Sequence, residues 1–161
     1  MKLTQAEQKK IEDYAQRFLE HKKGKSVKQG GKDDLYYDKL RFTGEYIVHK
    51  HFNKQFEWDF DRKQRFDDII LLYKDSAVVC DIKSSVSATE LRVPKWQIDE
   101  DKDRGIDIYI LVSIEEDFSG GDIVGIVSKK VFKKQAVLKK YNSECYCLGS
   151  EYLSSIDNLD G

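Results

Sequence analysis

FDDIILLYKDSAVVCDIKSS, residues 66–85, is the stretch that decides the fold. It contains two apolar runs, residues 68–73 and 77–84, with only KDS between them. Because the connection is so short, the two runs are expected to pair as an antiparallel hairpin. Their apolar residues are continuous rather than alternating, which is typical of strands that are covered on both faces in α/β proteins.

The hairpin carries charges where its strands should be most apolar. Asp68 opens the first strand, and Asp81 and Lys83 follow in the second. Side chains alternate between the two faces of a strand, so Asp81 and Lys83 point the same way. A two-residue loop would pair Asp68 with Asp81 or with Lys83 and gather all three charges on one face. A three-residue loop without a bulge would send Asp68 to the other face, so the cluster depends on the register.

Two carboxylates on a buried face need a compensating cation. Lys83 alone could supply it as a simple ion pair. A divalent metal could compensate both, since Mg²⁺ typically takes one or two carboxylates, several waters and phosphate oxygens, and the Ile82 carbonyl would add a hard oxygen ligand. Beside such an ion, Lys83 could orient a water or stabilise charge on a phosphoryl group. These are the requirements of phosphodiester hydrolysis.

The chain before the hairpin predicts two helices joined by a basic connection. Residues 4–22 have apolar side chains at spacings of three and four, and Thr4 and Glu7 have the spacing of a capping box. Residues 22–34 combine three glycines and five lysines with almost nothing apolar. We therefore expect a flexible basic linker between the helices.

The second helical pattern runs from Leu35 to about Phe52 and carries Glu45 near its apolar stripe. Arg41 and His49 are each four residues from Glu45, so a helix-surface pair is one interpretation, favoured on position alone. The other interpretation is that Glu45 joins the charged cluster of the hairpin.

The rest of the chain predicts further strands and helices. The only proline, Pro94, stands where a helix could begin, and Gly105 stands where that helix would end. The other predicted elements are strands at 55–60, 106–114 and 121–128, a short basic helix at 128–141 and an edge strand at 145–148. This order of elements predicts an α/β sandwich with a mixed sheet.

Composition bounds the domain count and the compartment. The chain has 161 residues, 40% of them hydrophobic, which suits one domain. Its 28 basic and 29 acidic residues give a net charge of −1, which counts against nucleic-acid binding unless the charges segregate in space. No apolar run approaches the roughly 20 residues that cross a bilayer, and no signal peptide or disulfide framework is indicated. We therefore expect a cytoplasmic protein without a membrane partner.

Residues 35–128 resemble the PD-(D/E)xK nuclease superfamily, which includes many restriction endonucleases, Holliday-junction resolvases and phage or repair exonucleases. The acidic residue that opens the family's second core strand matches Asp68, and its D/E-x-K triplet matches residues 81–83. The glutamate of the family's first helix matches Glu45. Gln97 in VPKWQID stands where some members carry a glutamine.

The chain departs from the family motif at two positions. Asp67 replaces the family's proline, so either Asp67 or Asp68 could be the ligand. Asp68 is preferred because it directly precedes the apolar run IILL. The third acidic position is Asp81 rather than the commoner glutamate, which the motif allows.

The resemblance implies a restriction-endonuclease-like sandwich, with a central mixed β-sheet flanked by helices. It also implies a nuclease that uses Mg²⁺ or Mn²⁺ to hydrolyse DNA phosphodiester bonds. One nuclease-like domain would span residues 1–161, with an N-terminal helix and linker (1–32), a catalytic core (33–148) and a C-terminal tail (149–161). The implied metal ligands are Glu45, Asp68, Asp81 and the carbonyl of Ile82, and the implied catalytic residues are Lys83, Asp81, Asp68, Glu45 and Gln97.

DNA is the expected partner, recognised by its structure or backbone, because no helix-turn-helix or zinc-finger pattern is present. One alternative is a non-catalytic DNA- or protein-binding module that keeps the nuclease fold and uses the cluster as a salt bridge. Another is a nuclease subunit of a larger assembly, and a homodimer would suit symmetric cleavage of two strands. The expected DNA contacts are Lys25, Lys28, Lys32, Ser84 and Lys95.

Overall fold

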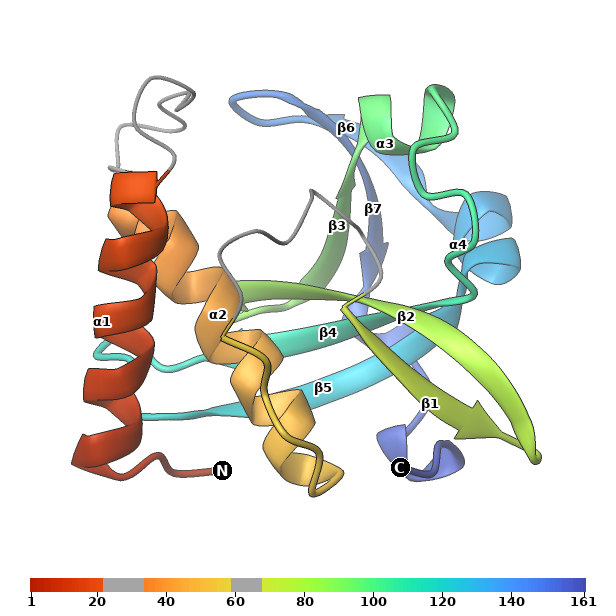
Figure 1. The fold of residues 1–161 in the computed structure, drawn as a ribbon. Helices are drawn as coiled ribbons and strands as arrows, with labels where there is room; N and C mark the ends of the chain where they lie inside the picture. The colour runs from red at the N-terminus through yellow and green to blue at the C-terminus, as the bar shows by residue number, and fades with distance from the viewer. Residues whose placement is uncertain (22–33, 59–67) are drawn as a thin grey trace.

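The computed structural model describes residues 1–21, 34–58 and 68–161, which form a mixed α/β fold (Figure 1). Its central sheet has four strands in the order β1-β2-β4-β5. β2 and β4 are parallel, whereas β1 and β5 run antiparallel to their neighbours, so the sheet is mixed as predicted. The strands are β1 (Ile69–Tyr73), β2 (Ser76–Val86), β4 (Ile108–Ile114) and β5 (Gly121–Ser128).

β1 and β2 form the predicted hairpin, in which Tyr73 pairs with Ser76 across a two-residue turn. The turn residues Lys74 and Asp75 both have positive φ, 48° and 62°. Two positive φ values define the type I′ turn, whose backbone matches the right-handed twist of paired strands. The short KDS connection therefore makes a two-residue turn rather than a three-residue one.

The register of the hairpin decides where its charges lie. Ile69 pairs with Cys80, so the next pair in the same register sets Asp68 opposite Asp81. Directly opposed residues of antiparallel strands share a face. The two-residue turn thus gives the register on which the charged cluster depends, and Asp81 and Lys83 share one face of β2.

β1 is an edge strand, and only one of its faces is covered. Ile69 and Leu71 are buried in the core that the helices cover, whereas Ile70 and Leu72 on the opposite face are 56% and 38% exposed. The prediction that both faces are covered is wrong for this strand because it borders the sheet. It holds for the central strand β4, where every residue except Ser113 is buried.

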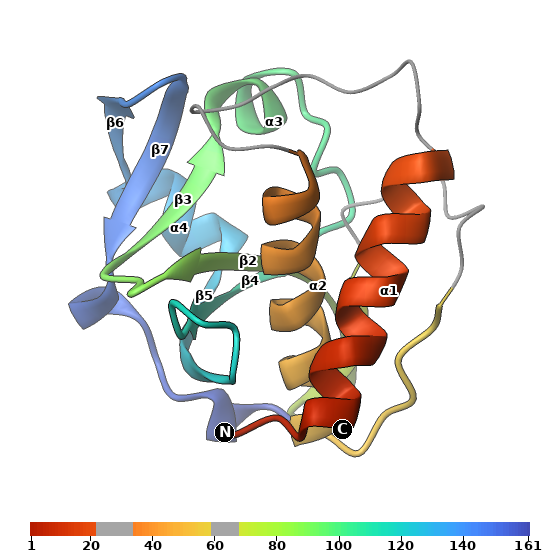
Figure 2. The same ribbon diagram turned by 90° about the vertical axis from the view of Figure 1, so that its left-hand side faces the viewer.

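Two N-terminal helices, α1 (Gln5–His21) and α2 (Asp34–His51), confirm the predicted helices. α2 lies on the central sheet, and α1 packs on the outer side of α2 (Figure 2). The predicted capping box is present at the start of α1. The Thr4 N–H donates to Glu7 Oε2 over 2.7 Å, and the Glu7 N–H donates to Thr4 Oγ1 over 3.2 Å.

Gly44 allows α2 to approach β2 very closely. A Cβ atom at this position would lie 1.8 Å from Ser84 Oγ and 2.9 Å from Ser84 Cβ. Neither distance leaves room for a side chain, so glycine is required here for steric reasons. The close approach holds the next residue, Glu45, against the sheet, where it is fully buried.

A smaller antiparallel sheet, in the order β3-β7-β6, lies on the side of the central sheet away from α2 (Figure 2). Its strands are β3 (Glu90–Pro94), β7 (Glu144–Gly149) and β6 (Val137–Lys140). A second hydrophobic core joins this sheet to the central strand β4. Its members include Leu91, Val93, Tyr109, Leu111 and Leu148.

The helix predicted from Pro94 to Gly105 is much shorter in the structure. Only α3 (Lys95–Asp99) is helical, because residues 100–105 form turns in which Asp101 has a positive φ of 52°. Pro94 ends that strand, and its φ of −53° suits the start of a helix. Gly105 has a φ of 90° and lies in the turns that follow the helix.

The basic helix predicted at 128–141 is also shorter, and it ends as α4 (Lys129–Gln135). Ala136 has extended backbone angles, and the residues after it form β6 rather than a further helical turn. The strand predicted at 145–148 is part of β7. It is the middle strand of the smaller sheet and not an edge, since β3 and β6 pair with it on either side.

The strand predicted at 55–60 is wrong for residues 55–58, which have no strand structure. Phe56 and Trp58 instead pack on Tyr14 of α1, with ring centroids 5.9 and 4.8 Å from its ring. The alternating aromatic pattern thus reflects packing against helices. Residues 59–67, including Asp67, lie outside the described residues.

The chain ends beside the hairpin. Two short 3₁₀ helices, η1 (Ser150–Tyr152) and η2 (Ile156–Asn158), follow β7. Asp160 then exchanges backbone hydrogen bonds of 2.8 and 2.9 Å with Leu72 of β1. Across the described parts of the chain, no helix is long and apolar enough to cross a membrane.

Candidate functional site

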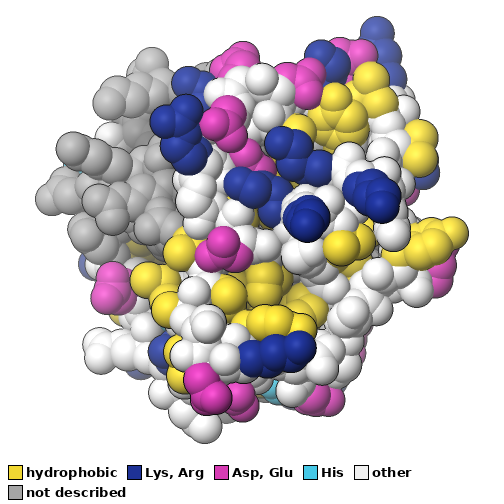
Figure 3. All heavy atoms as spheres, turned by 90° about the vertical axis from the view of Figure 1, so that its right-hand side faces the viewer, with side chains coloured by type: hydrophobic (Ala, Val, Ile, Leu, Met, Phe, Trp, Pro, Cys, Tyr) yellow, Lys and Arg dark blue, Asp and Glu magenta, His cyan; other side chains and the backbone are white. Residues whose placement is uncertain are grey.

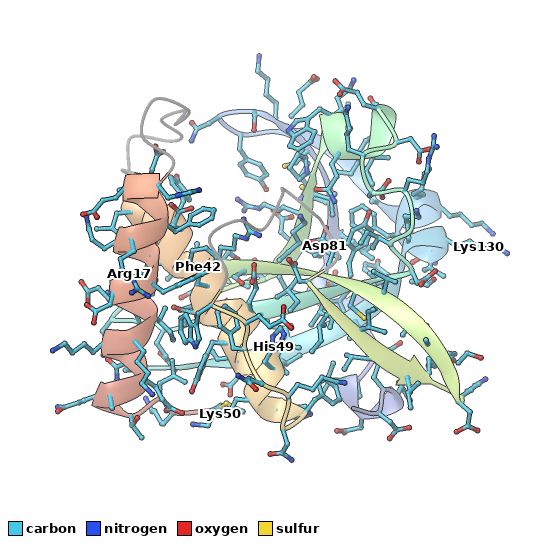
Figure 4. The ribbon with its side chains drawn as sticks, in the orientation of Figure 1. Arg17, Phe42, His49, Lys50, Asp81 and Lys130 are labelled. Atoms are coloured by element: carbon cyan, nitrogen blue, oxygen red, sulfur yellow. The ribbon has the colours of Figure 1, made fainter. Side chains whose placement is uncertain are left out.

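Asp81 and Lys83 of β2 form the centre of the charged cluster. The Lys83 Nζ lies 2.9 Å from Asp81 Oδ2, and the Asp81 side chain is almost completely buried. Ile82, between them in the chain, packs on the opposite side in the core under α2. Figure 4 places Asp81 in the interior beside the start of β1, whereas Lys130 on α4 points outward.

Gln97 completes a triangle with these two residues. Its Nε2 donates to Asp81 Oδ2 over 2.7 Å, and its Oε1 accepts from Lys83 Nζ over 3.1 Å. Gln97 is fully buried and comes from α3, which begins directly after Pro94. The amide therefore fixes the relative positions of the carboxylate and the ammonium group. These contacts place Gln97 beside the D-x-K residues, and its catalytic role stays a prediction.

Asp68 enters the cluster from the first residue before β1. Its Oδ2 accepts a 2.7 Å hydrogen bond from the backbone N–H of Ile82, and its own N–H donates to the Cys80 carbonyl over 2.9 Å. The Asp68 carboxylate thus accepts a hydrogen bond from a backbone N–H of β2 just before the point where β1 begins. This contact fixes Asp68 against the middle of the Asp81–Lys83 triplet.

Glu45 reaches the cluster from α2 through Arg41. The Arg41 Nε lies 2.7 Å from Glu45 Oε1, and its Nη2 lies 3.9 Å from Asp68 Oδ1. The helix pair between Arg41 and Glu45 was one of the two interpretations of the sequence. Sequence reasoning missed that the same guanidinium also reaches Asp68 of the hairpin, because four-residue spacing carries no information on that distant contact.

A tyrosine closes the cluster on the side of β4. Tyr109 is the neighbour of Asp81 in the parallel β2–β4 pair, and it is fully buried. Its hydroxyl donates to Asp103, a second buried carboxylate. The sequence pattern of β4 indicated only a buried strand, so neither residue was expected near the site.

Among the side chains that the structure describes, negative charge exceeds positive charge in the cluster. Glu45, Asp68 and Asp81 are accompanied by the cations Arg41 and Lys83. Burial raises the pKa of Asp68 well above its usual value, and repulsion from Glu45 and Asp81 raises it further against the opposing effect of Arg41 and the Ile82 N–H. Burial and repulsion therefore disfavour the charged form of Asp68.

The same interactions act on Arg41 in the opposite sense. Burial alone would lower its pKa, but attraction to Glu45 and Asp68 raises the pKa of the guanidinium above its already high ordinary value. Arg41 is therefore a permanent cation that the two carboxylates hold in place.

The oxygens of the cluster suit a hard divalent cation. Within residues 1–21, 34–58 and 68–161, no group of three His, Cys, Asp or Glu side chains is arranged to hold a metal ion. Mg²⁺ needs fewer, because it usually keeps several waters and takes one or two carboxylates. Asp68 and Asp81, which lie close enough to repel each other, fit that requirement. Glu45 already has a close ion pair with Arg41.

The predicted DNA contacts have three different outcomes. The Oγ of Ser84 is buried where α2 contacts β2 at Gly44, so the prediction that it contacts phosphate is wrong for this arrangement. Lys95 is partly exposed at the start of α3 and forms a 2.7 Å ion pair with Asp99. The other three predicted contacts lie outside the described residues; they are Lys25, Lys28 and Lys32.

The face that carries α3 and α4 shows a group of Lys and Arg side chains with Asp and Glu side chains around it (Figure 3). Part of this basic character comes from α4, whose sequence KKVFKKQ has four lysines and no acidic residue. The charges of the chain are thus partly segregated, which removes part of the objection that the net charge raises against DNA binding.

No known family model, curated protein sequence or solved structure matches this chain. The structure defines the class as a mixed α/β protein whose mixed central sheet is flanked by helices. The restriction-endonuclease-like fold and the membership of the PD-(D/E)xK superfamily stay predictions. Any functional conclusion must therefore come from the geometry of the cluster.

Proposed function

We propose that this chain is a metal-dependent nuclease that hydrolyses DNA phosphodiester bonds. The observation that carries the proposal is that Asp81, Lys83 and Gln97 contact one another directly, while Asp68, just before β1, accepts a hydrogen bond from the backbone N–H of Ile82 between Asp81 and Lys83. Buried charges that repel one another destabilise a fold, and such clusters occur most often at functional sites. The position of Asp68 opposite Asp81 supports this reading.

Each residue has a distinct role in the proposed reaction. Asp68 and Asp81 would hold Mg²⁺ or Mn²⁺ with the carbonyl of Ile82, and the bound ion would supply an activated water and charge stabilisation. Lys83 would orient the attacking water or stabilise the charge that grows on the phosphoryl oxygens. Gln97 would hold the Lys83 and Asp81 side chains in fixed relative positions by its two hydrogen bonds.

DNA is the proposed substrate class, and its recognition would depend on backbone or structure. The basic helix α4 and the helix α3, which carries Lys95, lie on the same side of the molecule (Figure 1), and their lysines would attract phosphates. The lysines of residues 22–34 would add to this attraction. Cleavage of both strands would need a homodimer or a larger assembly.

The proposal predicts that Lys83→Ala abolishes metal-dependent cleavage while the protein still folds. Linear, nicked, flapped and four-way-junction DNA would be incubated with Mg²⁺ or Mn²⁺ and either the parent or the variant. Lys10→Ala, on the exposed side of α1, is the matched control and should cut at the parental rate. Equal cleavage by the parent and Lys83→Ala would show that Lys83 is not catalytic.

A second candidate function is a non-catalytic module that binds DNA or a partner protein. The observation in its favour is that Asp81, Asp68 and Glu45 each already have a donor: Lys83 and Gln97, the Ile82 N–H, and Arg41. Metal titration separates the two functions. If millimolar Mg²⁺ and Mn²⁺ neither bind nor change the melting temperature, the module is the better assignment.

A further inference from the structure

Arg41 occupies a particular place in the candidate site. Its guanidinium contacts Glu45 at 2.7 Å and Asp68 at 3.9 Å, so one cation serves two buried carboxylates. The carboxylate side chains are at most 5% exposed, whereas the Arg41 side chain is 38% exposed. Arg41 therefore lies at the open side of the site, with the carboxylates behind it.

The position of Arg41 follows from the helix that carries it. Arg41 precedes Glu45 by one turn of α2, and Gly44 lets this part of the helix lie directly on β2. The planar guanidinium can contact two acceptors at once, which a lysine ammonium on a single flexible stem does less well. The contact with Asp68 thus depends on both the length and the fork of the arginine side chain.

A guanidinium and a divalent cation at Asp68 would repel each other. Both neutralise the same carboxylate, and two cations within a few ångströms interact strongly where water is partly excluded. Arg41 must therefore move from Asp68, or lose part of its attraction, when a metal ion binds there. The free energy needed for that movement reduces the affinity of the site for the ion.

We infer that Arg41 competes with the divalent cation for Asp68 and thereby sets the metal affinity of the site. This inference rests on the proposed function, since it takes Asp68 and Asp81 as the metal ligands. It assigns Arg41 a role beyond a helix-surface pair. When the ion displaces it from Asp68, Glu45 still holds the guanidinium near the open side of the site.

Mn²⁺ binding to the full chain, measured by calorimetry at pH 7.5, tests the inference without relying on catalysis. Arg41→Gln should bind Mn²⁺ at least tenfold more tightly than the parent because the competing cation is gone. Arg41→Lys keeps a positive charge near Glu45 but loses the fork, and it should bind at least threefold more tightly. Arg104→Gln removes an equally charged side chain that is 85% exposed, and it should leave the affinity unchanged.

Several outcomes would overturn the inference. Unchanged or weaker Mn²⁺ binding by Arg41→Gln would mean that Arg41 does not compete with the ion. An equal gain from Arg104→Gln would attribute the effect to net charge. If Arg41→Gln does not fold, Arg41→Lys decides the question, and parental affinity in that variant refutes the competition.

The same measurements separate this inference from the proposed function. A parent that cleaves DNA with Mn²⁺, together with parental Mn²⁺ affinity in both Arg41 variants, would refute the competition alone. Absence of Mn²⁺ binding in the parent and in Arg41→Gln would refute both, because removal of the competitor should reveal the site. Asp81→Asn provides the positive control for location, since it should weaken the binding that Arg41→Gln strengthens.

Discussion

Substitution of Gly44 by alanine tests the close contact that holds α2, and with it Glu45 and Arg41, against β2. The new Cβ would lie 1.8 Å from Ser84 Oγ, 2.9 Å from Ser84 Cβ and 3.7 Å from Val112 Cβ. The first two distances require the backbone of α2 or of β2 to move, because rotation of the Ser84 hydroxyl relieves only one of them. Gly44→Ala should therefore destabilise the fold.

The expected loss of stability combines two opposing effects. Overpacking a core costs about 1–3 kcal/mol, and the short distances here place Gly44→Ala near the upper end of that range. Alanine gains about 1 kcal/mol over glycine in a helix interior. The net loss is then about 2 kcal/mol, which lowers the melting temperature of a chain of this size by about 4–8 °C.

A double-mutant cycle isolates the contact. Ser84→Gly removes both close atoms, so in that background Gly44→Ala should be neutral or stabilising by about 1 kcal/mol, the helix propensity alone. Ser85→Gly removes the neighbouring side chain on the other face of β2 and is the matched control. In the control background the loss should stay at about 2 kcal/mol. Urea unfolding, followed by circular dichroism, measures all six proteins.

The reasoning would be refuted if Gly44→Ala were harmless in the parent. It would also be refuted if Gly44→Ala changed the free energy of unfolding equally in the Ser84→Gly and Ser85→Gly backgrounds. Either result would mean that α2 does not lie as close to β2 at this point. The placement of Glu45 and Arg41 beside Asp68 would then lose its support, since both residues belong to the same turns of α2.

Two further predictions concern the stability of the cluster itself. Burial, followed by repulsion from Glu45 and Asp81, raises the pKa of Asp68 in the folded state, so this group lowers stability as pH rises above the ordinary carboxyl pKa. Asp68→Asn should therefore unfold at a higher urea concentration than the parent at pH 7, and this difference should shrink towards pH 4. A gain in stability that does not depend on pH would contradict the raised pKa as its cause. Gln97→Leu leaves Asp81 without its amide donor and should cost about 1–3 kcal/mol in urea unfolding, whereas Gln135→Leu on α4 should change little. Equal stability of the two glutamine variants would show that the Gln97 hydrogen bonds contribute nothing.

The hairpin and its charged face could be predicted because they depend on local features. Alternation along a strand places Asp81 and Lys83 together whatever the rest of the chain does. The position of Asp68 needed one further fact, the two-residue turn at Lys74 and Asp75. Gln97 was found through the resemblance to a nuclease motif rather than through its own pattern.

The elements that sequence reasoning missed depend on distant contacts. Every residue of β3 pairs with a β7 residue more than 50 positions later in the chain, so its short sequence ELRVP carries little signal. β6 has the sequence VLKK and continues the basic pattern of α4, and it becomes a strand because β7 pairs with it. The contact of Arg41 with Asp68 was missed for the same reason, because it joins α2 to a residue 27 positions later in the chain.

The charge on Asp68 distinguishes the two candidate functions. In a purely structural cluster, Lys83 pairs with Asp81, and Arg41 lies 2.7 Å from Glu45 and 3.9 Å from Asp68. Asp68 then needs only an acceptor for the Ile82 N–H, and asparagine would provide that acceptor without the repulsion that raises the Asp68 pKa. An aspartate at this position destabilises a salt-bridge module, whereas a metal site requires it. Under the proposed function, the charged side chain before β1 would therefore serve cation binding rather than support of the fold.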